Sequence, residues 1–395
     1  MNDVDALWAF LVAAVVAWAL TPVAARLAFR VGAVALPRDR DLHDRPMPRL
    51  GGLAILAGAL VAGLLFMPAN EETRGILGGA AAIALIGAAD DRFNLHPFVK
   101  LAGQFAAAAI PVMSEVRVEN MTLPFVDPVD LGGTLGAVLT LVGIVVVMNV
   151  VNLTDGADGL AAGVCTIAAT TFAVIALSLD RVDAGILAAL TAGAAMGFLW
   201  HNFHPASIFM GDSGSNLLGL LLACVAIQGV LKTAAVVALF FPLVILAVPI
   251  LDTAFVVAKR IKYRQPVHRA DNEHFHHRFS RIGFSQRRTV LYLYAWTVSL
   301  AALALALRFV PYSDDDGTLN GGWAVVMATF FLIAIAASVY LVVVLEILKF
   351  RRFRERELRR QVQTGEVPAL SEAEIEAEVE REVETGEFQA VGPEE

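Results

Sequence analysis

Two adjacent carboxylates, Asp90 and Asp91, end an apolar run and are the first residues of this sequence that could do chemistry. Adjacent acids repel each other unless a cation neutralises them. Acids at the C-terminal end of a helix also oppose the helix dipole. The pair therefore predicts a catalytic or metal-binding role for Asp90 and Asp91, in preference to a solvated helix end.

A second acidic segment reads NVVNLTDGADGLAAG over residues 149–163. Asn152, Asp155 and Asp158 are three positions apart, so in a helical turn they would share one face. Asp155 or Asp158 could equally cap the helix that follows. The backbone amides at the start of that helix would suit an anion such as a phosphate.

A third segment, residues 201–219, places Asp212 between glycine and serine residues directly before a helix. Glycine lets the backbone approach a phosphate closely, and a carboxylate is a hard ligand suited to Mg²⁺. We expect Asp212 to bind a metal ion. A glycine-rich, capped turn is the alternative.

The fourth segment, HRADNEHFHHRF over residues 268–279, holds four histidines, two acids and arginines. Zinc is the obvious rival metal, but the neighbouring acids favour a phosphate–Mg²⁺ site. Cys165 and Cys224, the two cysteines, both lie in distant apolar runs. Arginines such as Arg269 can hold phosphates through two parallel hydrogen bonds.

These segments must be positioned by apolar helices, because the chain is 57% hydrophobic and only 17% charged, with a mean hydropathy of +0.66. Soluble domains carry roughly 25% charged residues, and a spanning helix needs about 20 apolar residues. We predict an all-α polytopic membrane protein with about 11 transmembrane helices. The first run lacks a basic leader and is expected to stay as a span. The predicted spans are 7–30, 50–67, 76–89, 98–113, 134–151, 160–179, 184–200, 214–230, 233–258, 290–310 and 322–348.

The basic residues of the loops orient these spans. With the N-terminus outside and the C-terminus cytoplasmic, 22 Lys and Arg residues fall on the inner side and 4 on the outer side. All four chemistry-bearing segments then lie on the cytoplasmic face. Such a layer suits a lipid headgroup meeting a cytosolic substrate, whereas a transporter more often places ionisable groups near the midplane.

The chain divides into a membrane domain over residues 1–349 and a cytoplasmic charged tail over residues 350–395. Residues 371–395 hold ten Glu and one Arg, which accounts for the net charge of −8. The near-neutral body gives no basis for a nucleic-acid partner. We expect the Glu-rich part to be solvated, partly disordered and without an apolar face. The outer loop 114–133 is expected to form a short hairpin.

The order DD, NLTDGADG, FMGDSGS and HFHH between spanning helices resembles the polyprenyl-phosphate N-acetylhexosamine-1-phosphate transferases. The resemblance covers roughly residues 5–350. It implies a Mg²⁺-dependent phosphotransferase of the plasma membrane, with Mn²⁺ as a substitute and the active site on the cytoplasmic side. A UDP-sugar and a polyprenyl phosphate would be its substrates, and a homodimer is compatible with it.

The histidine segment DNEHFHH is similar to the branch that uses UDP-N-acetylglucosamine, and the muramoyl-pentapeptide branch is the alternative. The acceptor would be undecaprenyl or decaprenyl phosphate, and UMP would be released. The resemblance also implies the roles of individual residues. Asp212 matches the metal ligand; Asp90 and Asp91 match the catalytic acid pair; His274, His276 and His277 match the histidine motif; Asn152, Asp155, Asp158, Asn202, Phe209 and Lys100 match substrate-binding positions. We also expect Asp91 to bind the metal ion, and Arg269 to bind the substrate phosphates.

Two mechanisms follow for such an enzyme. In the first, the lipid phosphate attacks the β-phosphorus of the UDP-sugar directly. In the second, an aspartyl-phosphate forms as an intermediate. A transporter of nucleotide-sugar or lipid, or a catalytically inactive scaffold, remains the alternative of a different class.

Overall fold

The computed structural model describes residues 3–36, 46–121, 129–231, 250, 286–311, 320–340, 354–356, 358–362, 364 and 370–385. The chain splits into two compact units. The first comprises Met1–Ser280 with Ser285–Val310, and the second comprises Arg281–Phe284 with Pro311–Glu395. Each unit is described by itself.

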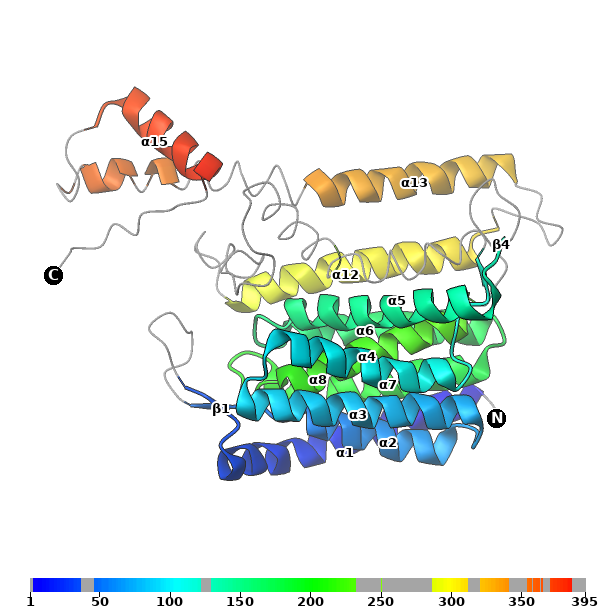
Figure 1. The fold of residues 1–395 in the computed structure, drawn as a ribbon. Helices are drawn as coiled ribbons and strands as arrows, with labels where there is room; N and C mark the ends of the chain where they lie inside the picture. Colours follow the sequence, from blue (N-terminus) through cyan, green and yellow to red (C-terminus); the bar gives the residue numbers. More distant parts are fainter. Residues whose placement is uncertain are drawn as a thin grey trace. The chain divides into compact units, whose positions relative to one another are not determined.

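The first unit is a bundle of helices that run side by side (Figure 1). Two short antiparallel hairpins accompany them: β1 (Val34–Ala35) pairs with β2 (Met47–Pro48), and β3 (Asn120–Met121) pairs with β4 (Val129–Asp130). The helices are α1 (Asp3–Val31), α2 (Gly51–Phe66), α3 (Glu71–Phe93), α4 (Pro97–Met113), α5 (Gly132–Thr154), α6 (Leu160–Ser178), α7 (Val182–Asn202), α8 (Gly211–Ala226), the π-helix η1 (Ile227–Leu231) and α12 (Gln286–Phe309).

Helix α8 forms the centre of this bundle and packs against α2, α3, α5, α6 and α7. From Ser213 to Ala226 every residue of α8 is buried. Helix α1 packs on α7 and α2 through small residues such as Ala9, Ala13 and Ala17, which lets the helix backbones approach closely. Its opposite face exposes Trp8 and Trp18, as expected of a surface that meets lipid.

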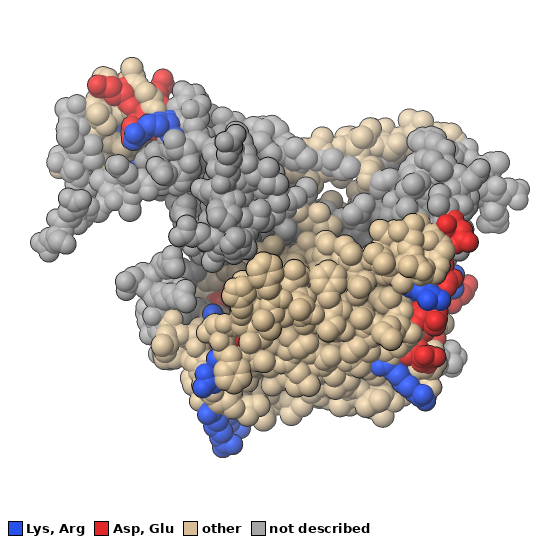
Figure 2. Space-filling view, in the orientation of Figure 1, with Lys and Arg blue, Asp and Glu red and all other residues tan. Residues whose placement is uncertain are grey.

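Five helices of the described residues are long and apolar enough to cross a membrane by length and composition: α1, α5, α6, α7 and α12. Figure 2 shows a band without Lys, Arg, Asp or Glu across this unit, with charged side chains gathered toward two ends. Both observations agree with a polytopic helical membrane protein. The number of eleven spans stays a prediction, because the span at 233–258 lies outside the described residues apart from residue 250.

Helix α3 is longer than the predicted span 76–89 because polar residues extend both of its ends. The side chain of Asn70 accepts a hydrogen bond from the backbone amide of Thr73 (2.8 Å), and Asn94 closes the helix in a left-handed conformation. Asp90 and Asp91 therefore lie inside the last turn of α3. Their predicted place at the C-terminal end of a helix is confirmed, and the helix itself continues about one turn beyond the predicted span.

The loop 114–133 forms a hairpin as predicted, since β3 and β4 pair within it. The hairpin of β1 and β2 was not predicted, because its strands have only two residues each. Its strand β2 leads directly into α2.

The second unit contains α13 (Gly321–Tyr340) and α15 (Glu372–Thr385). The side chains of Ser371 and Glu374 form a capping box at the start of α15, with the Ser371 amide donating to Glu374 (2.8 Å). Ile375 and Val379 are buried in a cluster with Leu358. The expectation that the Glu-rich segment has no apolar face is therefore wrong: these two residues, four apart, make one. Partial disorder of the tail stays a prediction.

Candidate active site

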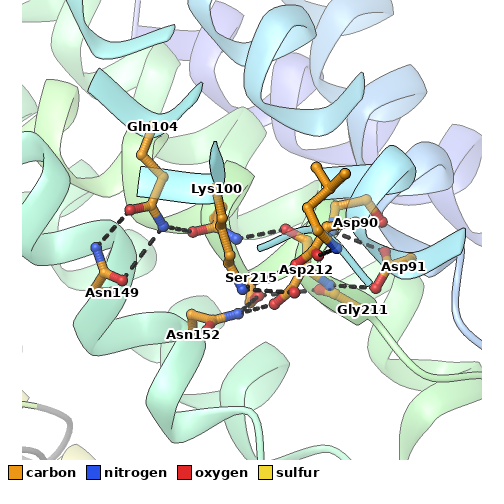
Figure 3. A network of polar contacts seen from close by, with 12 residues as sticks. Asp90, Asp91, Lys100, Gln104, Asn149, Asn152, Gly211, Asp212 and Ser215 are labelled. Carbon is orange, nitrogen blue, oxygen red and sulfur yellow. Dashed lines mark hydrogen bonds and ion pairs between the residues drawn. The ribbon is translucent and has the colours of Figure 1, made fainter. Parts of the chain in front are cut away.

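Asp212, in the first turn of α8, lies at the centre of a network of polar contacts (Figure 3). The Lys100 ammonium of α4 donates to Asp212 Oδ2 at 2.6 Å and lies 3.2 Å from Asp90 Oδ2 at the end of α3. One cation thus sits between two carboxylates from different helices. This arrangement offsets the repulsion that two neighbouring carboxylates would otherwise suffer.

The other carboxylate oxygen of Asp212 faces α5. Asn152 donates through Nδ2 to Asp212 Oδ1 and to Ser215 Oγ, the latter at 2.8 Å. Ser215 in turn donates to the Gly211 carbonyl oxygen at 3.0 Å. The side chain of Asp212 is therefore held from both sides, by α4 and by α5.

Asp91 makes different contacts from Asp90. Its Oδ1 accepts a hydrogen bond from the Asp212 backbone amide at 2.8 Å, and its Oδ2 accepts one from the Ser213 amide at 3.1 Å. Asp91 thus caps the N-terminus of α8 from a neighbouring helix and satisfies two amides that have no partner within α8. Both of its oxygens point to the backbone that carries Asp212.

Two glycines make this approach of α3 and α8 possible. A Cβ atom at Gly87 would lie 2.5 Å from the Asp212 carbonyl oxygen, so any larger residue would push the helices apart. Gly211 has φ +70°, a conformation that L side chains rarely adopt. The GDSG sequence therefore serves the packing of α8 as well as any contact with a phosphate.

Asp90 keeps one oxygen toward the network. Its Oδ1 accepts the Leu95 amide at 2.7 Å, which fixes the turn after α3. Its Oδ2 faces Lys100. Of the acid pair, Asp90 is therefore the residue that meets the polar cluster.

Asp155 follows the last residue of α5 and is half-buried beside the same cluster. Burial, followed by the negative charges of Asp212 and Asp91, raises the pKa of Asp155 to about 8, although Arg49 acts in the opposite direction. A bound cation would reverse this effect by stabilising the ionised carboxylate.

Asp158 makes contacts that differ from those of Asp155. Its Oδ2 contacts His204 Nδ1 at 2.9 Å and accepts the Ala206 amide at 3.2 Å. Helix α5 ends at Thr154, and the following residues turn before α6 begins. The expectation that Asn152, Asp155 and Asp158 share a helical face is therefore wrong. Gly159 occupies the N-cap of α6 with φ 79° and no side-chain cap, so neither acid caps that helix.

Asn202 and Phe209 lie in the segment that joins α7 to α8. Asn202 is buried, accepts the Gly159 amide at 3.0 Å and donates to the Ile208 carbonyl at 2.9 Å. The backbone of Phe209 bonds to that of Pro48 and Gly51, next to the start of α2. Asn202 thus connects two loops through backbone groups, and Phe209 is half-buried.

Four predicted site residues lie outside the described residues: Arg269, His274, His276 and His277. Their place in the site stays a prediction. Helices α3, α4 and α5 follow one another in the chain, and α8 comes two helices later. Together they place six predicted site residues in one cluster: Asp90, Asp91, Lys100, Asn152, Asp155 and Asp212.

Sequence reasoning missed three buried or half-buried amides next to this cluster: Gln104, Asn149 and Asn216. Gln104 Nε2 donates to Asn216 Oδ1 at 2.7 Å, and Asn149 Nδ2 donates to Gln104 Oε1 at 2.9 Å. A signal existed. Each amide lies three or four positions from Asn152, Asp212 or Lys100 in an apolar helix, which places it on the same face.

The donor set fits Mg²⁺ better than a softer metal, because its charged ligands are all carboxylates. Among the described residues, no group of three or more His, Cys, Asp or Glu side chains is arranged to hold a metal by itself. Mg²⁺ usually binds to one or two carboxylates together with substrate phosphates. The Lys100 ammonium shows that the space between Asp90 and Asp212 accommodates a positive charge.

Residues 73–230 match the family model described as Glycosyl transferase family 4. The chain is 39% identical over 301 residues to a Bacillus subtilis protein described as a probable undecaprenyl-phosphate N-acetylglucosaminyl 1-phosphate transferase, covering 75% of this chain and 84% of that protein. It is 37% identical over 341 residues to the decaprenyl-phosphate N-acetylglucosaminephosphotransferase of Mycobacterium leprae (79% and 86%). A phospho-N-acetylmuramoyl-pentapeptide-transferase of Desulforudis audaxviator is 33% identical over 328 residues (76% and 95%).

Proposed function

Because the chain belongs to glycosyl transferase family 4, we propose that it transfers N-acetylglucosamine 1-phosphate from UDP-N-acetylglucosamine to a polyprenyl phosphate. The names of the relatives from Bacillus subtilis and Mycobacterium leprae support this substrate pair, and this chain covers more than four fifths of each relative. The product is a lipid-linked diphosphate sugar that starts a cell-envelope glycan.

In this reaction an oxygen of the lipid phosphate attacks the β-phosphorus of the UDP-sugar. A new P–O bond forms there, and the bond to the oxygen that bridges the two phosphates breaks. UMP leaves with that oxygen and its charge. Both reactants are anions, so charge repulsion is a major part of the barrier, and a phosphotransferase needs positive charge and alignment more than a base.

The single observation that carries the proposal is the placement of Lys100 between Asp90 and Asp212. The ammonium is available to neutralise a phosphate when a substrate enters. Asp212, held by Asn152 and by the start of α8, would be the principal metal ligand. Mg²⁺ bound there with the substrate diphosphate would supply charge neutralisation.

Asp90 would position the attacking phosphate through Lys100. The second pKa of a phosphate monoester is about 6, so the acceptor is already mostly ionised at neutral pH. Removing a proton from it gains little. A general base is therefore not required, and we propose that the ionised acceptor attacks directly; an aspartyl-phosphate intermediate is the alternative.

The active site is assigned to the cytoplasmic face of the plasma membrane. The excess of Lys and Arg in the loops on that side supports this orientation. The histidine segment around His276, with Arg269, is proposed to complete the site next to the diphosphate.

The test is UMP release by the full-length protein in detergent, supplied with polyprenyl phosphate, Mg²⁺ and either UDP-N-acetylglucosamine or UDP-N-acetylmuramoyl-pentapeptide. We expect UMP only with the first donor and only when both lipid phosphate and Mg²⁺ are present. Release from the second donor would reassign the sugar. A phospho-sugar trapped on Asp90 without lipid acceptor would contradict direct attack.

A further inference from the structure

Gln104, Asn149 and Asn216 form a second polar layer next to Lys100, Asn152 and Asp212, which we call the reactive layer. Gln104 follows Lys100 on α4 by four residues, and Asn216 follows Asp212 on α8 by four. Asn149 precedes Asn152 on α5 by three. Since residues three or four apart lie on one face of a helix, the same three helices present two stacked layers, one turn apart.

Gln104 is the centre of this amide layer, which we define as Gln104, Asn149 and Asn216 (Figure 3 draws the contacts of Gln104). Its Nε2 donates to Asn216 Oδ1 (2.7 Å) and, at a longer distance, to Asn149 Oδ1 (3.4 Å). Its Oε1 accepts from Asn149 Nδ2 (2.9 Å). Every polar atom of the Gln104 side chain has a partner, although the residue is only 1% exposed.

The amide layer is also joined to the reactive layer. Asn216 Nδ2 donates to the backbone carbonyl oxygen of Asp212 at 2.8 Å. The same side chain thus contacts Gln104 and the first turn of α8. A rotation of α8 that moved Asp212 away from Lys100 would therefore also break the hydrogen bond between Asn216 and Gln104 of α4.

Buried amides are costly unless their donors and acceptors are paired. Because α4, α5 and α8 are otherwise apolar along this face, few rotations or axial shifts of these helices would pair Gln104 with both partners. An apolar contact alone would tolerate small sliding movements, whereas directional hydrogen bonds do not.

We propose that Gln104, Asn149 and Asn216 are positioning residues that fix the rotation and register of α4, α5 and α8, so that Lys100, Asn152 and Asp212 meet. The kinetic consequence rests on the proposed function, but the structural consequence does not. Without the amide layer, Lys100, Asn152 and Asp212 are still present, but their side chains are no longer aligned. The metal affinity of the site then falls even where the protein stays folded.

The test replaces Gln104 by Leu, an apolar residue of similar size, in the full-length protein. Mn²⁺ alone is titrated into the substrate-free protein in detergent, and free Mn²⁺ is followed by electron paramagnetic resonance. We expect Gln104→Leu and Asn216→Leu each to weaken Mn²⁺ binding by about tenfold, the lower end of the effect seen when groups behind a metal ligand are removed. The KM for Mg²⁺ in UMP release should rise with it.

Gln228→Leu is the matched control. Gln228 donates to Glu72 at 2.6 Å and joins η1 to the start of α3, so it is also a buried amide that pairs with another helix. It lies in η1, beyond the C-terminal end of α8, whereas Asp212 lies in the first turn of α8. We expect this variant to lose thermal stability and to keep the Mn²⁺ affinity of the wild type.

The double variant Gln104→Leu/Asn216→Leu separates positioning from stability. Removing both members of the pair leaves fewer unpaired groups, so thermal stability should recover in part relative to the sum of the single variants. Mn²⁺ affinity should stay low, because no directional contact is restored.

Three results would overturn the proposal. Mn²⁺ binding by Gln104→Leu and Asn216→Leu could equal that of the wild type, or the Gln228→Leu control could weaken it as much. Mn²⁺ affinity could also recover in the double variant together with stability. If the wild type releases no UMP but the Mn²⁺ affinities follow the expected order, the proposed function fails and the positioning layer stands.

Discussion

Lys100 and Asp212, which are 112 positions apart in the chain, form an ion pair of 2.6 Å between α4 and α8. The same ammonium reaches Asp90 at 3.2 Å. This pair joins the acid pair of α3 to the acid of α8. Substrate phosphates and a metal ion would have to exchange places with these contacts, so Lys100 would pass from a carboxylate partner to a phosphate partner during the reaction.

Replacing Lys100 by Met is expected to lower kcat/KM for UDP-N-acetylglucosamine by about 100-fold, the usual effect of losing one charged or hydrogen-bonding group at a reacting anion. Lys100→Arg should recover only part of this loss, because a planar guanidinium cannot occupy the same point between Asp90 and Asp212. The rate of UMP release at several substrate concentrations gives kcat/KM for both variants. The exposed residue Arg181, at the other end of α7 from Asn202, supplies the control Arg181→Met, which should retain full activity.

The same Lys100→Met variant leaves Asp90 and Asp212 facing each other without a cation. Mg²⁺ should therefore raise the midpoint of thermal unfolding of the variant more than that of the wild type. An equal shift in the two proteins would show that divalent cations do not bind between these carboxylates.

Asp91 is expected to act through α8, because both of its oxygens accept backbone amides there. Asp91→Asn replaces one acceptor by an NH₂ group that faces a donor, so the metal-free protein should be destabilised by about 1–2 kcal/mol, the size of a lost helix cap. Differential scanning fluorimetry in EDTA measures this. An unchanged unfolding midpoint in EDTA, with a higher Mg²⁺ requirement, would instead favour Asp91 as a direct metal ligand.

Gly87→Ala should impair activity through packing alone. The added methyl group would lie 2.5 Å from the Asp212 carbonyl oxygen and would displace α3 from α8. Gly78→Ala on the same helix is the control, because its nearest neighbour, Ile110 Cγ2, would be 3.5 Å away. We expect Gly78→Ala to keep its activity and to gain a little stability from helix propensity. Equal activities in the two variants would contradict the close packing of α3 against α8 beneath Asp212.

Asp155 predicts how stability depends on pH in the absence of metal. The pKa of Asp155 is raised from its ordinary value to about 8. The folded protein therefore holds this proton more tightly than the unfolded chain, and its contribution to stability is lost as the pH rises toward and through 8. Thermal midpoints measured in EDTA between pH 5 and 9 should fall less steeply for Asp155→Asn than for the wild type.

With Mg²⁺ present, the wild type should approach the flatter profile of Asp155→Asn, because a nearby cation stabilises the ionised carboxylate. Parallel profiles for the two proteins in EDTA would mean that Asp155 is ionised throughout this range and is not coupled to the acidic cluster.

The positions of the helices could be predicted from the sequence because apolar runs of the required length are sufficient to define them. The helix ends could not be predicted where polar residues continue a helix. Helix α3 runs beyond its apolar run to its caps Asn70 and Asn94, and this extension places Asp90 and Asp91 inside the helix. The end of α5 at Thr154 likewise means that Asp155 and Asp158 do not share one helical face with Asn152, as regular spacing in a helix would have required.

The residue types of the site could be predicted from the sequence, but most of the contacts between these residues could not. Carboxylates in several loops on one face indicate a metal–phosphate site whichever helices carry them. That Asp91 caps α8 depends on the approach of α3 at Gly87, which is a tertiary contact. The contacts of Gln104 likewise depend on how α4, α5 and α8 are rotated about their axes.

The most direct test of the central claim is an experimental structure of the full-length protein with UDP-N-acetylglucosamine and Mn²⁺, in which the metal is located by its anomalous signal. The account predicts a metal ion bound directly by oxygens of the Asp212 carboxylate and of the donor diphosphate, with Lys100 Nζ moved from Asp212 to a phosphate oxygen. A diphosphate bound elsewhere, with the contact between Lys100 and Asp212 intact, would contradict it.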